Sequence, residues 1–235
     1  MMLRALGVFW LLVFAAPAHA QCRQALALGL DVSGSVDARE YRLQMDGLAQ
    51  ALSTPEVKAK LLSQTGTPVM LLIYEWSGPD DQQTVLPWHS ITSANALDQV
   101  IDLLQNTERR EASPGTALGQ AMQVGAAHLA GTECWSKTLD ISGDGKSNLG
   151  IRPRDAKPMI LTQGITINGL VIGADAPSID DARQTEISEL SSYYRAEVIL
   201  GADAFVETSL GFADYAAAMT RKLMRELQDV QLSLR

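Results

Sequence analysis

Apolar runs alternate with amphipathic stretches along this chain, which predicts alternating strands and helices. The run Val69–Trp76 is apolar on both faces until its end, as in a parallel strand that helices cover on both faces, and Ile165–Ile172 is expected to be another strand. A shorter run at 83–88 follows a turn and is expected to return beside 69–76 as an antiparallel edge strand. The remaining strands are expected at about 24–32, 137–142 and 196–200.

Between these runs, apolar residues recur at helical spacing. In the stretch 37–53 they follow one another at i, i+4, i+7 and i+11, which predicts a stripe that packs on a sheet: Tyr41, Met45, Leu48 and Leu52. Further helices are expected from Ser93, from about Thr116, over 153–163, over 179–191 and over 209–232. The chain therefore predicts a doubly wound α/β fold, with a mostly parallel six-stranded sheet, one short antiparallel edge strand and helices on both faces.

The first twenty residues have the features of a signal peptide. Arg4 precedes an apolar run at 6–16, and Ala18-His19-Ala20 is a small-x-small cleavage site. Because the run has only about 11 residues, it is too short to span a bilayer comfortably. We therefore expect a signal peptide over 1–20, one domain over 21–235, no transmembrane helix in the mature chain, and export to the periplasm or beyond. The alternative is an uncleaved membrane anchor.

The charge balance argues against nucleic acid as a partner. Without Arg4, the 19 basic residues become 18, against 27 acidic ones, so the mature chain has a formal charge of −9. The sequence also contains no basic stripe of the kind that follows a phosphate backbone.

The two cysteines are expected to form a disulfide, because export allows one to persist. Cys22 lies nine residues before Asp31, and Cys134 lies ten before Asp144. If the two strands are parallel neighbours, both cysteines lie at the end of the sheet opposite these acidic residues. The alternative is a pair of unrelated buried thiols.

Three strand-end loops carry side-chain oxygens. The first strand ends in an Asp-x-Ser-x-Ser motif formed by Asp31, Ser33 and Ser35, and later loops contribute Thr116 and Asp144. In open α/β sheets, ligands bind beyond the carboxyl ends of the strands. Oxygen-only ligands suit a hard cation such as Mg²⁺. The alternative is that the two serines only cap the next helix and that Asp144 belongs to a Gly-Asp-Gly turn.

This set, in this order, resembles the von Willebrand factor A (vWA) domain family, whose metal-ion-dependent adhesion site (MIDAS) uses Asp-x-Ser-x-Ser, a distant Thr and a distant Asp. The stretches 142–148, 164–170 and 221–223 look like those of a group of secreted bacterial vWA-like proteins without an established activity. The resemblance implies that the serine hydroxyls bind the metal and that Thr116 binds directly or through water. It implies that Asp31 and Asp144 bind mostly through water, or that one of them binds directly.

The resemblance also implies a function. One divalent cation, Mg²⁺ or else Mn²⁺ or Ca²⁺, would grip an acidic residue of a protein ligand, so the chain would be an exported adhesion or binding module without catalytic residues. One alternative is a metal-dependent phosphohydrolase, although no second carboxylate joins Asp31 in an Asp-x-Asp pair and no general base is evident. Another is a structural envelope protein in which a metal only stabilises the fold.

Two carboxylates interrupt the apolar strands and require partners if they are buried. Glu75 ends the second strand, and Asp140 stands between Leu139 and Ile141. We interpret both as bonded to loop backbones or to a nearby arginine, with a supporting position around the metal as the alternative. Trp76 and Trp88 are candidates for an apolar wall beside the site, or for core packing.

Overall fold

The computed structural model describes residues 22–173 and 180–227. The predicted signal peptide therefore lies outside the described residues. In chain order the elements are β1 (Gln24–Asp31), α1 (Ala38–Ser53), α2 (Pro55–Leu62), β2 (Val69–Trp76), β3 (Gln82–Ile91), α3 (Ala94–Asn106), α4 (Leu118–Ala130), β4 (Ser136–Gly143), α5 (Pro153–Leu161), β5 (Ile165–Ile172), α6 (Asp180–Tyr193), the π-helix η1 (Tyr194–Val198), β6 (Val206–Ser209), the 3-10 helix η2 (Phe212–Asp214) and α7 (Tyr215–Glu226).

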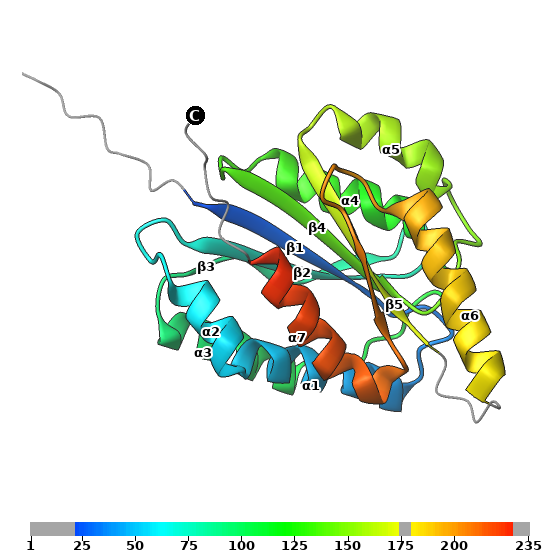
Figure 1. The fold of residues 1–235 in the computed structure, drawn as a ribbon, viewed down its shortest axis with the longest axis horizontal. Helices are drawn as coiled ribbons and strands as arrows, with labels where there is room; N and C mark the ends of the chain where they lie inside the picture. The colour runs from blue at the N-terminus through cyan, green and yellow to red at the C-terminus, as the bar shows by residue number, and fades with distance from the viewer. Residues whose placement is uncertain (1–21, 174–179, 228–235) are drawn as a thin grey trace, which may run out of the picture.

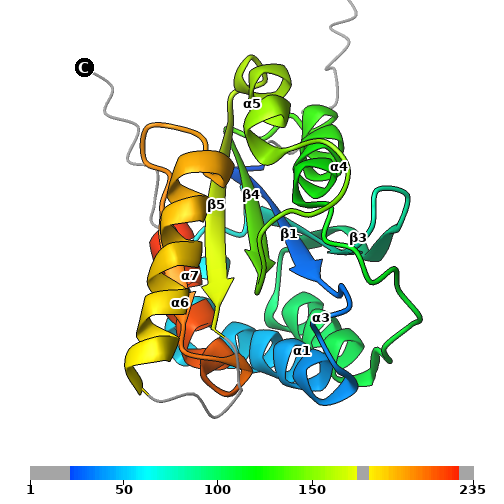
Figure 2. The ribbon, with the colours of Figure 1, turned by 90° about the vertical axis from the view of Figure 1, so that its right-hand side faces the viewer.

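The strands form one sheet in the order β3-β2-β1-β4-β5-β6 (Figure 1). Only β3 runs antiparallel to its neighbour; every other pair is parallel. One apolar core lies between the sheet and helices α1, α2, α3 and α7, and a second lies between the opposite face and α4, α5 and α6 (Figure 2). The predicted fold class is confirmed.

The first crossover fixes where the candidate loops lie. All eight residues of β1 are buried, and α1 begins soon after the strand because Asp37 and Glu40 form a reciprocal capping box. In the register of β1 with β4, Gln24 pairs with Ser136 and Leu30 with Ser142. The loops after these two central strands therefore leave the sheet side by side.

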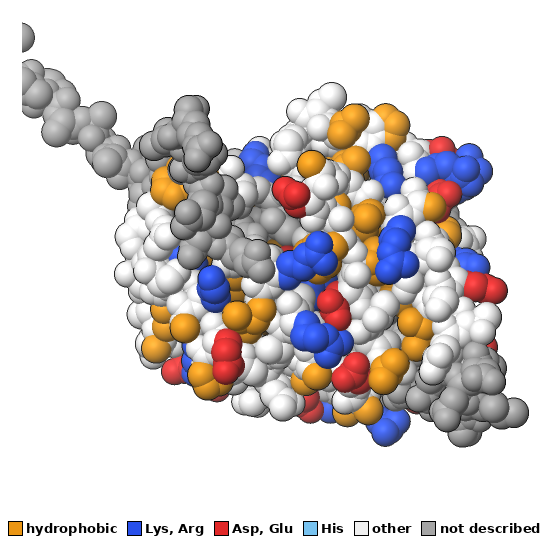
Figure 3. Space-filling model, viewed as in Figure 1, with side chains coloured by type: hydrophobic (Ala, Val, Ile, Leu, Met, Phe, Trp, Pro, Cys, Tyr) orange, Lys and Arg blue, Asp and Glu red, His pale blue; other side chains and the backbone are white. Residues whose placement is uncertain are grey.

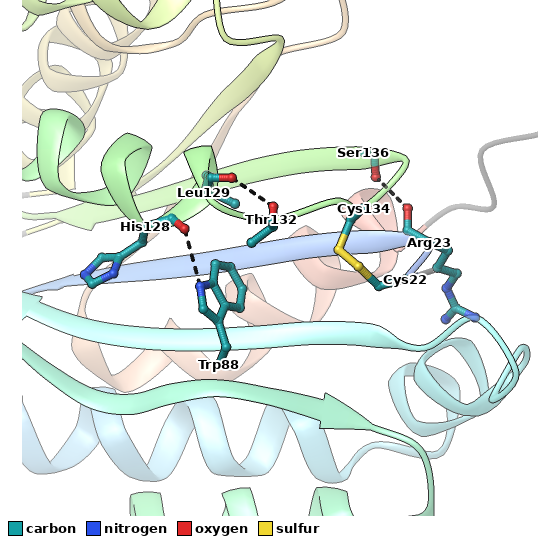
Figure 4. Close-up of a disulfide and its surroundings, with 8 residues drawn as sticks. All are labelled: Cys22, Arg23, Trp88, His128, Leu129, Thr132, Cys134 and Ser136. Carbon is teal, nitrogen blue, oxygen red and sulfur yellow. Dashed lines mark hydrogen bonds between the residues drawn. A yellow bond between two sulfur atoms is a disulfide. The ribbon is translucent and has the colours of Figure 1, made fainter. Parts of the chain in front are cut away.

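The opposite end of the same strands carries the disulfide (Figure 4). Cys22 and Cys134 are bonded, with 4.6 Å between their α-carbons. The Trp135 backbone N–H donates to the Cys22 carbonyl, so the pairing of β1 with β4 continues into the segments before these two strands. The predicted disulfide is confirmed.

The prediction of the last strand is wrong. The stretch expected as a strand at 196–200 lies mostly in the π-helix η1, and Leu200 makes only an isolated bridge with Ile167. The sixth strand is instead β6, which pairs with β5 in parallel. A short apolar run carries no periodicity that separates a strand from a buried turn of helix, and here packing on β5 decided.

Three other boundaries differ from the prediction. The edge strand β3 is not short: it is ten residues long and keeps pairing with β2 past a register shift between Leu71 and Ile73. The helix α2, which begins at Pro55, was not predicted. The last helix was expected over 209–232, but Ser209 ends β6 and α7 begins at Tyr215, while 228–232 lies outside the described residues.

Within the described parts of the chain, no helix combines the length and the apolar character that crossing a membrane requires. The face shown in Figure 3 carries lysine and arginine side chains interspersed with aspartate and glutamate.

Candidate metal centre

The structure brings the five predicted residues together beyond the carboxyl ends of β1 and β4. The Ser35 hydroxyl donates to Asp144 Oδ1 at 2.7 Å and lies 3.2 Å from the Ser33 hydroxyl. The Thr116 hydroxyl lies 3.5 Å from Ser33 Oγ, and the Ser33 backbone N–H donates to Asp31 Oδ1 at 2.8 Å. Side chains from three separate loops are thus in mutual contact.

Exposure changes steadily across this group. Asp31 and Ser33 are completely buried and Thr116 is nearly so, whereas Asp144 is half-buried and Ser35 is exposed. The group is therefore covered on the side of the sheet and open to solvent on the side of Ser35.

Close backbone contacts hold the first loop. The Gly34 N–H donates to the Pro114 carbonyl at 3.2 Å, and a β-carbon on Gly34 would lie only 3.0 Å from Pro114 Cα. A larger residue would push these two loops apart. From beneath, the Gln44 side chain donates to the Asp31 carbonyl at 3.1 Å, which ties the loop to α1.

The second loop is held by residues that the sequence interpretation did not single out. Asn148 Oδ1 accepts from the Thr116 N–H at 2.8 Å, and the Asn148 N–H donates to the Thr116 carbonyl at 3.0 Å. Ser147 Oγ also donates to that carbonyl at 3.3 Å. The available signal was the pair Ser147-Asn148, which follows the Gly-Asp-Gly turn after Lys146, since short polar side chains there often bond to a neighbouring backbone.

Burial and mutual repulsion act on the two carboxylates. Burial, followed by the nearby Asp144, raises the pKa of Asp31 to about 8, although the hydrogen bonds from Ser33 lower it. Burial also raises the pKa of Asp144, against the hydrogen bond from Ser35. Both ionised forms are therefore disfavoured until positive charge is brought close.

The donor set fits a hard divalent cation. It consists of three hydroxyls and two carboxylates, and Asp31 Oδ2 is buried with no hydrogen-bond partner. Among the described residues, no three His, Cys, Asp or Glu side chains gather as a metal site. Any cation held here would depend on hydroxyl oxygens, which are ligands that Mg²⁺ accepts and that offer nothing to a soft metal.

Glu75 and Asp140 bind basic side chains. Glu75 accepts from the Tyr41 hydroxyl at 2.6 Å and pairs with Arg110 Nε at 3.1 Å. Asp140 lies on the face covered by α7, where its Oδ1 is 3.0 Å from Lys222 Nζ. Burial raises the pKa of Asp140 to about 7, while Lys222 lowers it. A lysine partner, 82 positions away in the chain, was not foreseen.

The two tryptophans lie in different places. The Trp76 ring is completely buried and reaches within 3.3 Å of the position that a β-carbon on Gly143 would occupy, directly beside Asp31. The Trp88 indole donates to the His128 carbonyl at 3.3 Å and lies near the disulfide (Figure 4). Only Trp76 is adjacent to the candidate centre.

A family model described as "Protein of unknown function (DUF1194)" matches residues 21–231. The chain belongs to this family. A search of curated proteins found no match.

Solved structures show which fold the family has. Proximal thread matrix protein 1 of the mussel byssus is 16% identical with a TM-score of 0.59, over 88% of this chain and 48% of that one. The pilus adhesin SpaC of Lactobacillus rhamnosus GG is 12% identical with a TM-score of 0.58, over 89% and 31%. BatB of Bacteroides thetaiotaomicron is 13% identical with a TM-score of 0.52, over 86% and 98%.

These likenesses establish a vWA-like fold. The chain spans about half the length of the mussel protein. Another structure of that mussel protein, 15% identical with a TM-score of 0.56 over 87% of this chain and 48% of that one, is described as having a zinc-occupied MIDAS motif.

Proposed function

We propose that this chain is an exported, metal-dependent binding module of the MIDAS type. One divalent cation, Mg²⁺ or else Mn²⁺ or Ca²⁺, is held by Asp31, Ser33, Ser35, Thr116 and Asp144. An acidic side chain of a protein partner completes its coordination. The observation that carries the proposal is the contact between hydroxyls and carboxylates from the loops after β1 and β4 and from the loop between α3 and α4, open to solvent at Ser35.

The donor chemistry explains why such a site takes a partner's carboxylate. Mg²⁺ requires six oxygens in near-octahedral geometry and keeps water where the protein supplies none. In the proposed set the three hydroxyls that bind the cation are neutral, and Asp31 and Asp144 act mostly through water, so the oxygens in direct contact with the cation incompletely neutralise its charge. A carboxylate that replaces a water on the exposed side supplies both the missing oxygen and the missing charge.

The choice of metal follows from the same donors. Zinc in structural sites prefers nitrogen and sulfur ligands in a tetrahedral arrangement. The oxygen-only set therefore favours Mg²⁺ over Zn²⁺, although the zinc-occupied motif of the mussel protein makes zinc a necessary comparison.

Export is supported by the disulfide and by the predicted signal peptide. Disulfides persist in the periplasm and outside the cell and are rare in the cytosol. The bond between Cys22 and Cys134 joins segments 112 residues apart and lies at the end of the sheet opposite the candidate centre.

Titration calorimetry of the chain from Gln21 onward with Mg²⁺, Mn²⁺, Ca²⁺ and Zn²⁺ tests the proposal. We expect one binding site that the Ser33→Ala/Ser35→Ala variant loses. The control is Ser53→Ala/Ser63→Ala, which removes two hydroxyls that bond only to helix backbone, at the far ends of α1 and α2. Binding that survives in the first variant, or that both variants lose, contradicts the proposed site.

A second titration in the presence of acetate tests the partner's chemistry. If a carboxylate completes the coordination, acetate raises the apparent metal affinity of the wild-type chain and leaves the serine variant without binding. Metal binding that acetate does not change contradicts the role of an acidic partner while leaving the cation site intact.

A further inference from the structure

Beneath the candidate centre, three buried polar atoms have no hydrogen-bond partner. They are Asp31 Oδ2 from β1, the Trp76 indole N–H from β2, and the Tyr194 hydroxyl from η1. Leaving a buried polar atom unpaired costs about 1–3 kcal/mol, and buried tyrosine hydroxyls usually find a partner. Unpaired groups at this depth therefore require an explanation.

Two of these atoms face the same small space. A β-carbon built on Gly143 would lie 2.6 Å from the Tyr194 hydroxyl oxygen and 2.9 Å from Asp31 Oδ2. Glycine at the end of β4 thus leaves room in which these two oxygens approach each other. The other carboxylate oxygen, Oδ1, already accepts from the Ser33 N–H, so Oδ2 is the one left to be bonded.

The backbone around Tyr194 is shaped to bring the hydroxyl there. Tyr194 begins the π-helix η1, a form that is rare, occurs mostly as single turns and is frequent at functional sites. The Tyr194 ring packs directly over a second glycine, because a β-carbon on Gly169 would lie 2.7 Å from Tyr194 Cδ1. Gly169 pairs with Ile141 and Gly143 with Val171, so the ring runs from β5 across to the end of β4.

We propose that Tyr194 is a positioning residue for Asp31: its hydroxyl donates a hydrogen bond to Oδ2 when the cation is bound and fixes the orientation of the carboxylate. The inference rests on the proposed function, because it concerns one of the proposed ligands. A carboxylate whose second oxygen accepts a hydrogen bond from the protein loses less conformational freedom when it binds the metal. Removing a hydrogen-bond donor of this kind typically weakens metal binding 10–100-fold.

The variant Tyr194→Phe tests this inference, because it removes only the hydroxyl and keeps the ring over Gly169. We expect a Kd for Mg²⁺ or Mn²⁺ at least about tenfold higher than in the wild-type chain. In metal-free buffer we expect an unchanged or slightly higher Tm, because the lost hydroxyl has no partner there. The matched control is Tyr215→Phe, another fully buried tyrosine, on the opposite face of the sheet; its metal affinity stays that of the wild type.

Near-ultraviolet difference spectra distinguish a positioning role of the Tyr194 hydroxyl from a purely structural one. Metal addition perturbs the tyrosine bands of the wild-type chain, and we expect Tyr194→Phe to lose most of that change while Tyr215→Phe keeps it.

The remaining outcomes separate the two proposals. Wild-type binding that Tyr194→Phe matches within twofold overturns this inference and leaves the metal site standing. An equal loss in both tyrosine variants overturns it too, as does a Tyr194→Phe chain that fails to fold without metal, because the hydroxyl would then act in the fold itself. A wild-type chain that binds no metal, with or without acetate, overturns the proposed function together with this inference.

Discussion

Two groups of buried carboxylates lie against the central strands, and they are neutralised in different ways. The α7 cluster consists of Asp140, Glu226 and Lys222; the lysine is completely buried and pairs with both acids. In the candidate metal centre, Asp31 and Asp144 accept hydrogen bonds from Ser33 and Ser35, which carry no charge.

The difference separates carboxylates that are neutralised within the fold from the carboxylates that we propose hold a metal. In the α7 cluster the cation is part of the chain, so its charge is present whenever the helix is packed, and Asn168 adds a hydrogen bond to Glu226 at 2.8 Å. In the candidate centre only dipoles face the acids, and burial disfavours their ionised forms. A divalent cation from solution would supply there what Lys222 supplies on the other face.

The largest effect is expected from removing the internal cation. Lys222→Met leaves Asp140 and Glu226 buried without their partner, which typically costs about 3–5 kcal/mol of unfolding free energy. Urea unfolding measures the loss. The control is Lys58→Met, which removes a largely exposed ion pair with Asp98 and should change the free energy of unfolding little. Metal affinity should stay the same in any folded fraction. A stability close to that of the wild type would show that the α7 cluster does not depend on its lysine.

A somewhat smaller loss is expected at the disulfide end of the sheet. Cys22→Ser/Cys134→Ser removes a link between segments 112 residues apart, and such a change typically costs about 2–5 kcal/mol. Because the disulfide lies at the opposite end of β1 and β4 from the candidate centre, metal affinity should not change. Unfolding curves and calorimetry measure the two properties separately. A drop in affinity at equal folded fraction would mean that the two ends of the sheet are coupled.

The last effect, the smallest for a change of one pH unit, concerns pH in metal-free buffer. The pKa of Asp31 rises from 3.8 to about 8 on folding, so the folded chain holds this proton more tightly than the unfolded chain. Its contribution to stability is therefore complete below pH 4 and is lost as the pH rises through 8, by at most about 1.4 kcal/mol per pH unit. Asp140, with a pKa of about 7, acts in the same direction.

Urea unfolding between pH 5 and pH 8 separates these contributions. Asp31→Asn should flatten the decline in EDTA, and saturating Mg²⁺ should stabilise the wild-type chain most at the upper end of the range. A decline with the same slope in both chains would assign the effect to the other acids with raised pKa values, Asp140 and Asp144, and remove Asp31 from the comparison.

Local pattern alone determined much of this protein. The alternation of buried runs and amphipathic stretches gave the strand and helix types and the fold class, because each depends on residues close in sequence. The Asp-x-Ser-x-Ser loop and Asp144 could be expected to meet, since the carboxyl ends of parallel strands share one edge. Thr116 was expected in a strand-end loop as well, but its loop joins α3 to α4 and follows no strand, so this argument does not place it. The disulfide followed from the similar spacing, nine and ten residues, of the two cysteines from the acidic residues Asp31 and Asp144.

Tertiary structure decided which buried groups meet. The pairing of Asp140 with Lys222, of Glu75 with Arg110, and the approach of Tyr194 to Asp31 join segments far apart in the chain. No local periodicity records such pairs, because they arise only when crossovers stack helices on the sheet. The same reason explains the failed strand at 196–200: a short apolar run has no periodicity that separates a strand from a buried turn of helix, and most of it lies in a π-helix whose tyrosine packs over the glycines of β4 and β5.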